Sequence, residues 1–314
     1  MNSGTQQKAL VDLLLTNVSN GYFPKEFICE KILPEIQHKN DTGKLGKYGS
    51  SHLRIVNTIT GGKGKYRQVD GVAYDSTGFS IESHGLSDLV TKKDYRNVTD
   101  PFKVEQDKIL ALATILWLEK EKGLADVLGN TAVLTQNTTL VGSQQYNDKL
   151  NSDPVSDFEN AQAAVVAGCG EKANTGIMSW EVFNKLKSHP QILDFLGYKF
   201  NRPGGLTEQE LCEAMGVEKL LIGMARYNSA AEGQAAVLSP VWGKNVIFAV
   251  CPDKAGLQQQ SLGYTVRLEG EAARKAYKTP VSNPPGSNEL ICEDEYDQLI
   301  SNASAAYLIK NAIA

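Results

Sequence analysis

Patterns of exported and membrane proteins are missing from this sequence. Its first residues, Met1-Asn-Ser-Gly-Thr-Gln-Gln, contain no basic segment followed by an apolar one, so we expect no secretory signal. The strongest apolar run, Ile109 to Leu118, is well short of the roughly 20 residues that cross a bilayer. We therefore expect neither export nor insertion into a membrane.

Cysteine is scarce, and its spacing fits no disulfide framework or zinc site. The five cysteines are widely scattered and include no C-x-x-C pair (Cys29, Cys169, Cys212, Cys251 and Cys292). An odd number of dispersed cysteines indicates reduced, partly buried thiols and folding in a reducing cytoplasm.

The motifs of common enzyme classes are missing as well. Thr60-Gly-Gly-Lys-Gly-Lys65 resembles a phosphate-binding loop, but Tyr66 stands where that loop requires Ser or Thr. Gly168-Cys-Gly-Glu-Lys-Ala173 resembles a dinucleotide fingerprint, but it follows a predicted helix, which favours helix termination by glycine. The four histidines are dispersed (His38, His52, His84 and His189). We predict no catalytic residue, no cofactor and no metal site.

An excess of positive charge, which dedicated nucleic-acid-binding proteins usually carry, is absent, since the formal net charge is -4. Charge is nevertheless uneven: cations gather between His38 and Arg67, and an acidic run lies near the other end (Glu289, Glu293, Asp294, Glu295 and Asp297). Such runs are usually solvated surface, but opposite runs far apart in sequence can also pair subunits. Our candidate assembly interface is Lys63, Lys65 and Arg67 against Glu293, Asp294 and Glu295.

What the sequence does contain is an N-terminal third that reaches outward. A short amphipathic helix is predicted from Thr5 to about Val18, and the chain from Leu45 to Leu86 is predicted to be extended. Its β-prone segments, Leu53 to Val56 and Val69 to Tyr74, flank the glycine-rich tip. Because these residues show little apolar clustering, their packing surfaces are expected on other chains, which points to assembly rather than catalysis.

A single long helix follows. Asp100 can cap it and Pro101 can occupy its first position. We predict that it continues through Gly123 to about Leu128, a length of roughly 40 Å at 1.5 Å per residue. Its apolar residues are grouped near the middle, so we expect it to lie across a sheet.

The middle of the chain, about residues 151–260, reads as a compact α/β domain. Two capping boxes predict helix starts, Ser156-x-x-Glu159 and Thr207-x-x-Glu210, with Gly168 and Gly216 as stops. His189-Pro190 is expected to break a helix that contains Trp180. Strands are predicted at Leu220–Met224, Val246–Val250, Gly263–Leu268 and between Leu299 and Ile313.

Segments spread over nearly the whole chain carry a family resemblance. They are Tyr22–Pro34, Phe79–Leu86, Pro154–Ala161, Ile177–Leu186 with His189-Pro190, Gly223–Asn228 and Val241–Lys244. In this order they resemble the major capsid proteins of tailed bacteriophages with the Hong Kong 97-type (Johnson) fold. Each segment is weakly specific alone, whereas the series is fairly specific.

The resemblance implies an α+β fold in five parts: an N-terminal arm (1–44), an extended β loop (45–86), a peripheral domain with a long spine helix (87–150), an axial α/β domain (151–260), and C-terminal strands returning to the peripheral domain (261–314). It implies self-assembly as hexamers and pentamers into the icosahedral head shell that encloses a double-stranded DNA genome.

The resemblance also implies partners and a location. A separate scaffolding protein is expected because the chain has no room for an N-terminal scaffolding segment, and a portal is expected with it. Packaged double-stranded DNA would be contacted non-specifically, and no membrane is involved. The expected location is the virion, with assembly in the host bacterial cytoplasm. Some members cross-link through a loop lysine; Lys63 and Lys65 lie in that region, but we do not predict a cross-link.

Two alternatives remain open. An encapsulin-like nanocompartment shell would share the fold but hold cargo enzyme instead of DNA. An oligomeric α/β enzyme could instead use the arm as a dimerisation device. Microscopy of the purified protein would separate a shell from an enzyme, and the neighbouring genes would separate a virus from an encapsulin.

Overall fold

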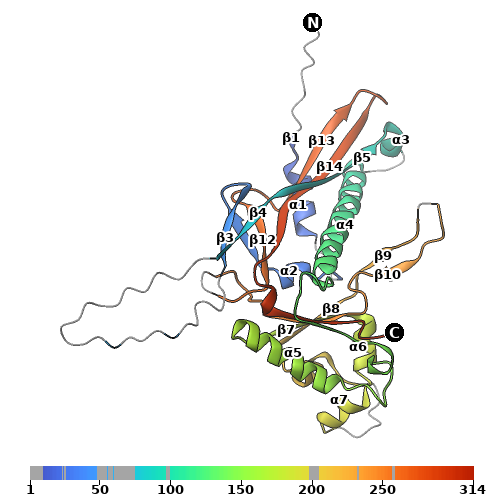
Figure 1. The fold of residues 1–314 in the computed structure, drawn as a ribbon. Helices are drawn as coiled ribbons and strands as arrows, with labels where there is room; N and C mark the ends of the chain where they lie inside the picture. Colours follow the sequence, from blue (N-terminus) through green and yellow to red (C-terminus); the bar gives the residue numbers. More distant parts are fainter. Residues whose placement is uncertain are drawn as a thin grey trace.

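The computed structural model describes residues 10–22, 24, 26–47, 55, 59, 75–96, 100–197, 205–231, 233–256 and 259–314. Within these ranges the chain forms two larger sheets and two separate two-stranded ribbons, with helices packed around them (Figure 1). The predicted α+β class is confirmed by this mixture of elements. Among the described residues, no helix has both the length and the apolarity that crossing a membrane requires.

The first sheet is built from strands near the N-terminus and strands near the C-terminus. Its order is β1 (Leu10–Val11), β13 (Arg274–Val281), β14 (Ser287–Ile300), β12 (Gly263–Leu268) and β2 (Glu35–His38), and β5 (Glu82–Val90) also pairs with β14. The C-terminal strands are central, and the N-terminal strands β1 and β2 lie at the two ends of this order.

The second sheet has both faces buried. Its order is β6 (Asn137–Thr139), β15 (Ala306–Lys310), β11 (Val246–Ala249), β7 (Thr175–Ser179) and β8 (Lys219–Gly223). Val246 and Phe248 belong to the core formed with α5 (Pro154–Cys169), α6 (Trp180–Leu186), α7 (Pro190–Phe195) and α8 (Glu208–Met215). Ile247 and Ala249 belong to a different core on the opposite face. Burial on both faces explains why the sequence of β11 is continuously apolar.

The long helix α4 (Pro101–Leu128) links the two sheets. Asp100 caps it by accepting a hydrogen bond from the Phe102 N–H, and Pro101 occupies the first position, as predicted. Ile109 and Leu112 in its first half pack with α1 (Leu13–Gly21) and the first sheet. Its second half packs with α2 (Cys29–Ile32) and the second sheet. The expectation that this helix lies across a sheet is confirmed.

Helix boundaries in the middle region agree with the sequence in part. The Thr207–Glu210 capping box and the stop at Gly216 are confirmed, and Gly216 has φ 65°. The predicted start at Ser156 is wrong, because Asp153 caps α5 and Pro154 follows it. The predicted stop at Gly168 is also wrong. The helix continues to Cys169, and Gly170 ends it with φ 81°.

The N-terminal helix begins later than predicted. Asp12 caps α1 by accepting hydrogen bonds from the backbone N–H groups of Leu14 and Leu15, so the helix starts at Leu13 after β1. Of the predicted strands, β8, β11 and β12 are confirmed. The β-prone segments at 53–56 and 69–74 and the tip at 60–65 lie outside the described residues. The strands β3 (Thr42–Lys47) and β4 (Asp75–Ser80) pair antiparallel on either side of that stretch.

Two expectations about packing are corrected. Residues near the N-terminus do have a core of their own, because Phe27, Ile32 and Leu33 are buried against α4 and the second sheet. The C-terminal strands do not all return to one place: β12, β13 and β14 lie in the first sheet, whereas β15 pairs with β11 in the second. All five cysteines are free thiols, and all but Cys212 are buried.

Candidate functional site

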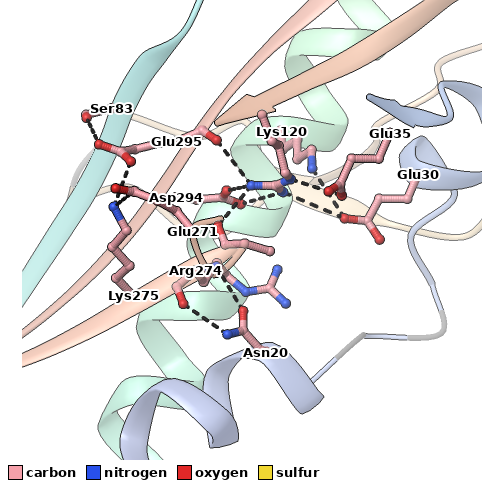
Figure 2. Close-up of polar contacts among 12 residues, drawn as sticks. Asn20, Glu30, Glu35, Ser83, Lys120, Glu271, Arg274, Lys275, Asp294 and Glu295 are labelled. Atoms are coloured by element: carbon pink, nitrogen blue, oxygen red, sulfur yellow. Dashed lines mark hydrogen bonds and ion pairs between the residues drawn. The ribbon is translucent and has the colours of Figure 1, made fainter. Parts of the chain in front are cut away.

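A cluster of charges with a buried centre lies where α1 and α2 meet α4 and the first sheet (Figure 2). We call it the charged junction and define it as Glu30, Glu35, Lys120, Arg267, Arg274 and Asp294. At its centre the Arg267 guanidinium forms an ion pair with Asp294, and the two side chains are only 4% and 3% exposed. Nε of Arg267 also lies 3.2 Å from a Glu35 carboxylate oxygen. One buried cation therefore joins β12, β14 and β2.

Lys120 is a second buried cation of the charged junction. Its side chain is 1% exposed, and its Nζ lies 3.3 Å from a carboxylate oxygen of Glu30. The ammonium also lies over two aromatic rings, 4.8 Å from the centre of Tyr296 and 5.1 Å from that of Trp117. Because a buried charge without partners is costly, these contacts are what allow a lysine on the inner face of α4. Lys120 thereby attaches the α2 segment to the long helix.

Arg274 holds the C-terminal end of α1. Its Nε donates to the carbonyl of Ser19 and its Nη2 to the carbonyl of Tyr22, both at 3.2 Å. Asn20 adds two hydrogen bonds to the backbone of Arg274 (Figure 2). Carbonyls at a helix end have no partners within the helix, so a guanidinium at this position satisfies them.

Glu121, next to Lys120 on α4, connects three parts of the molecule. Its carboxylate accepts hydrogen bonds from the backbone N–H groups of Ile28 and Cys29, at 3.1 and 2.8 Å. It also accepts a 2.6 Å hydrogen bond from Nε1 of Trp242. Burial raises the pKa of Glu121, while these donors act in the opposite direction. A single carboxylate thus ties α2 and the segment after β10 to the long helix.

The acidic run predicted as an assembly interface is largely engaged within its own chain. Asp294 is the buried partner of Arg267. Glu295 accepts hydrogen bonds from Lys275 at 2.8 Å and from Ser83 at 3.0 Å. The premise that this run has no compensating charge in the same chain is therefore wrong for these two carboxylates. Glu293 is half-buried and faces the Tyr277 hydroxyl.

The basic half of the predicted interface, Lys63, Lys65 and Arg67, lies outside the described residues. Sequence reasoning also missed Lys120, Glu121 and Arg267. The sequence contained a signal for Lys120 and Glu121. Trp117 and Leu124 lie on the buried face of α4, and positions 120 and 121 fall on the same face at helical spacing. Charged residues in register with an apolar stripe indicate buried polar contacts.

The charged junction is suited to holding parts of the chain together. Burial raises the pKa of the Cys29 thiol, with the Glu121 carboxylate adding to the effect, so this cysteine stays protonated. Within the described ranges, no group of three or more His, Cys, Asp or Glu side chains is placed to hold a metal ion. What the arrangement does is fix residues 12–38 against the long helix and the first sheet.

Two curated proteins match the chain over nearly its whole length. The major capsid protein of Burkholderia phage BcepMu is 27% identical over 308 residues, which cover 96% of each chain. The major capsid protein of Pseudomonas phage JBD67 is 22% identical over 307 residues, which cover 97% of each chain. No family model matches the sequence.

Solved structures share the fold. A phage-related protein from Bordetella bronchiseptica has a TM-score of 0.76 and 24% identity, with 98% of this chain and 99% of that chain covered. The capsid of cyanophage P-SCSP1u has a TM-score of 0.62 at 10% identity, covering 92% and 89% of the two chains. An encapsulin complex from Synechococcus elongatus is a more distant neighbour, with a TM-score of 0.51 and 9% identity over 96% of both chains. These likenesses concern the fold alone.

Proposed function

We infer that this chain is a phage major capsid protein with the Hong Kong 97-type fold. The observation that carries this inference is the end-to-end match to two phage major capsid proteins, together with a fold shared with phage capsid structures. The match includes the arm, the long helix and both sheets, so no large part of the chain is left over for a different activity.

We propose that the chain assembles with copies of itself, as hexamers and pentamers, into the icosahedral head shell around the double-stranded DNA of a tailed bacteriophage. A scaffolding protein and a portal would assist in the bacterial cytoplasm, and the finished protein would reside in the virion. DNA contacts would be independent of sequence and weaken with salt. In this proposal residues 1–44 are the arm, 45–86 the extended loop, 87–150 the peripheral domain, 151–260 the axial domain and 261–314 the returning strands.

The charged junction supports this proposal by giving the N-terminal segment a defined direction. Arg274 holds this segment near its first end and Arg267 near its second, while Lys120 and Glu121 hold α2 between them. A segment that leaves each subunit at one angle can meet a neighbour in the same way at every repeat of a symmetric shell. A loosely attached segment would lose that regularity.

An encapsulin-like shell is the alternative that the fold itself favours, because an encapsulin shares it. The sequence matches favour the phage protein, since both curated relatives are phage major capsid proteins. An enzymatic role has less support: the charged junction offers no nucleophile and base pair, and the relatives are named as capsid proteins. Genes for a portal, terminase and scaffold beside this gene would support the phage assignment; a cargo-enzyme gene in their place would contradict it.

Assembly is tested by producing the protein alone and together with the neighbouring scaffold gene. Negative-stain microscopy and light scattering should show closed shells or capsomers of uniform size. A matched pair of variants sharpens the result: R267M removes the central cation of the charged junction, and R96M removes an exposed arginine outside the junction. We expect R267M to lower the yield of regular shells more than R96M does. A wild-type protein that stays monomeric at all concentrations, with scaffold present, would contradict the proposed function.

A further inference from the structure

A two-stranded ribbon stands away from the body of the protein (Figure 1). It consists of β9 (Arg226–Asn228) and β10 (Leu238–Pro240), joined by residues 229–237, and we call residues 224–240 the ribbon. The joining sequence, Ser-Ala-Ala-Glu-Gly-Gln-Ala-Ala-Val, is made of small and apolar residues with one charge. Val237 and Leu238 are 56% and 61% exposed. Because Val237 and Leu238 are adjacent on a protruding element, together they form a small apolar surface that another molecule can cover.

Hydrogen bonds hold the described residues of the ribbon in a fixed arrangement. The Asn228 side-chain oxygen accepts hydrogen bonds from the backbone N–H groups of Ala230 and Val237, at 3.1 and 2.9 Å. The backbone N–H of Ser229 donates to the Val237 carbonyl at 2.9 Å. At the body, Trp242 is anchored by its hydrogen bond to Glu121 and packs directly on Gly223. Val237 and Leu238 are therefore presented at a defined place, which lowers the entropy cost of binding.

A small hollow, lined by apolar side chains and one ion pair, lies at the base of the same ribbon. Its lining is Trp180, Glu181, Gly223, Met224, Arg226 and Pro240, and its volume is about 90 Å³. Trp180 and Met224 are 39% and 49% exposed. Because a dry cavity of roughly 150 Å³ can hold benzene, a hollow of this size suits the end of one aliphatic side chain. Gly223 allows the Trp242 ring to pack directly behind the hollow, since a Cβ at position 223 would lie 2.1 Å from that ring.

The charges around the hollow narrow the choice of partner. Arg226 is paired with Glu181 at 3.0 Å, and the Lys187 ammonium lies over the Trp180 ring at 5.8 Å from its centre. A nucleic acid or an anionic lipid surface needs several available cations, and these two are already engaged. The surface therefore fits a protein partner that offers an aliphatic side chain.

We propose that the ribbon is a contact between two copies of this chain, in which Val237 or Leu238 of one copy fills the hollow of the other. The chain itself carries both complementary features, on one element, and in a shell the most abundant neighbour of any subunit is another copy. If a two-fold axis relates the copies, the ribbons lie antiparallel and Val237 and Leu238 of each copy face the other's hollow. This inference rests on the proposed function and adds a specific contact to it.

Engineered cysteines test the contact directly. The variant V237C/M224C places one thiol next to the first residue of β10 and one in the hollow. After mild oxidation of the oligomers or shells that it forms, non-reducing gels should show cross-linked chains that are absent from wild type and from each single variant. A ladder ending at dimers indicates a two-fold contact, and a ladder reaching pentamers or hexamers indicates a ring; both support a contact between copies. Shells without any cross-link would overturn it.

A charge substitution gives an independent measurement. L238E should lower the yield of shells at least tenfold, because it would bury a carboxylate against Trp180, Met224 and Pro240. V141E, at an exposed valine outside the ribbon, should leave the yield nearly unchanged. Both variants should unfold at the wild-type temperature as unassembled subunits. If L238E assembles as well as V141E, the ribbon contact is wrong while the proposed function stands. If the wild-type chain forms no oligomer at all, both are wrong.

Discussion

At the scale of single residues, the Arg267–Asp294 pair is the most consequential contact, because both groups are almost completely withdrawn from water. Replacing Asp294 with Asn would leave the buried guanidinium paired with Glu30 and Glu35, which are 39% and 44% exposed, and bonded to two backbone carbonyls. We expect D294N to lower the free energy of unfolding of the unassembled subunit by about 3–5 kcal/mol, measured by urea denaturation. The control D126N breaks an exposed pair with Lys122 and should change the free energy of unfolding by less than about 0.5 kcal/mol. Similar losses in D294N and D126N would show that the buried pair contributes no more to stability than an exposed one.

His189 predicts a pH dependence. Its ring is fully buried and its Nε2 lies 3.0 Å from the Ser152 hydroxyl, and burial, with Lys149 nearby, lowers its pKa. In the unfolded chain a histidine titrates near about pH 6.5, so the unfolded state takes up this proton first as pH falls. The stability that neutral His189 contributes is thus present above about pH 6.5 and is lost as pH falls from there towards the lower folded-state pKa.

Comparing urea midpoints at pH 7.5 and 5.5 tests this. The free energy of unfolding should fall more for wild type than for H189Q when the pH is lowered. For one proton, the difference between the two proteins is at most about 1.4 kcal/mol per pH unit. Titrations of other groups are common to both proteins and cancel in the comparison. Equal losses in wild type and H189Q would exclude His189 as the source.

At the scale of elements, the pairing of β12 with β14 requires a glycine at position 263, where there is no room for a side chain. A Cβ at Gly263 would lie 2.2 Å from the Leu299 carbonyl oxygen, which belongs to the backbone of the paired strand and cannot move aside cheaply. We expect G263A to cost about 2–4 kcal/mol by thermal or urea unfolding. Gly21, at the end of α1, has no atom within 4 Å of that position, so G21A should be neutral or slightly stabilising. A tolerated G263A would mean that the two strands separate there without loss.

The attachment of α2 to α4 should depend on the charge of Glu121. The variant E121Q keeps the size of the side chain but turns an amide N–H₂ towards donors that need acceptors. Losing a hydrogen bond to a charged group costs about 1.5–3 kcal/mol, which predicts at least roughly tenfold faster trypsin cleavage after Lys31. E119Q on the same helix is the control, since that side chain is 58% exposed. Unchanged cleavage in E121Q would show that α2 is held by its apolar residues alone.

How far the sequence predicted these elements depends on the range of the interactions. The bounds of α4 and the Thr207 cap were predictable because capping involves neighbours within one turn. The burial of Phe27 and the place of β15 were not, since their partners lie far away in the chain. The charged junction was missed for the same reason: Arg267 and Asp294 are 27 residues apart, and each on its own reads as a surface charge.

At the scale of the whole molecule, the candidate interface between the basic segment and the acidic run can be tested in a form that respects the structure. Reversing Lys63, Lys65 and Arg67 to Glu should slow assembly, followed by light scattering. Adding E289K and E293K should restore part of the rate, because Asp294 and Glu295 keep their partners within the chain. Exposed pairs contribute only about 0–1 kcal/mol each, so the effect should arise from repetition over many interfaces and shrink in high salt. If the combined variant assembles no better than the first, the two runs do not face each other.

The strand order of the first sheet determines when during synthesis this sheet can form. Leu10 pairs with Lys278, Glu35 with Thr265 and Leu89 with Glu289, so three early segments wait for partners that are translated last. Such distant pairings form slowly, because a long stretch of chain must be ordered at once. A ribosome-bound fragment therefore lacks the surface on which its N-terminal segment is held. Subunits would become competent to join a growing shell only when nearly the whole chain has been synthesised, which keeps incomplete chains out of the particle.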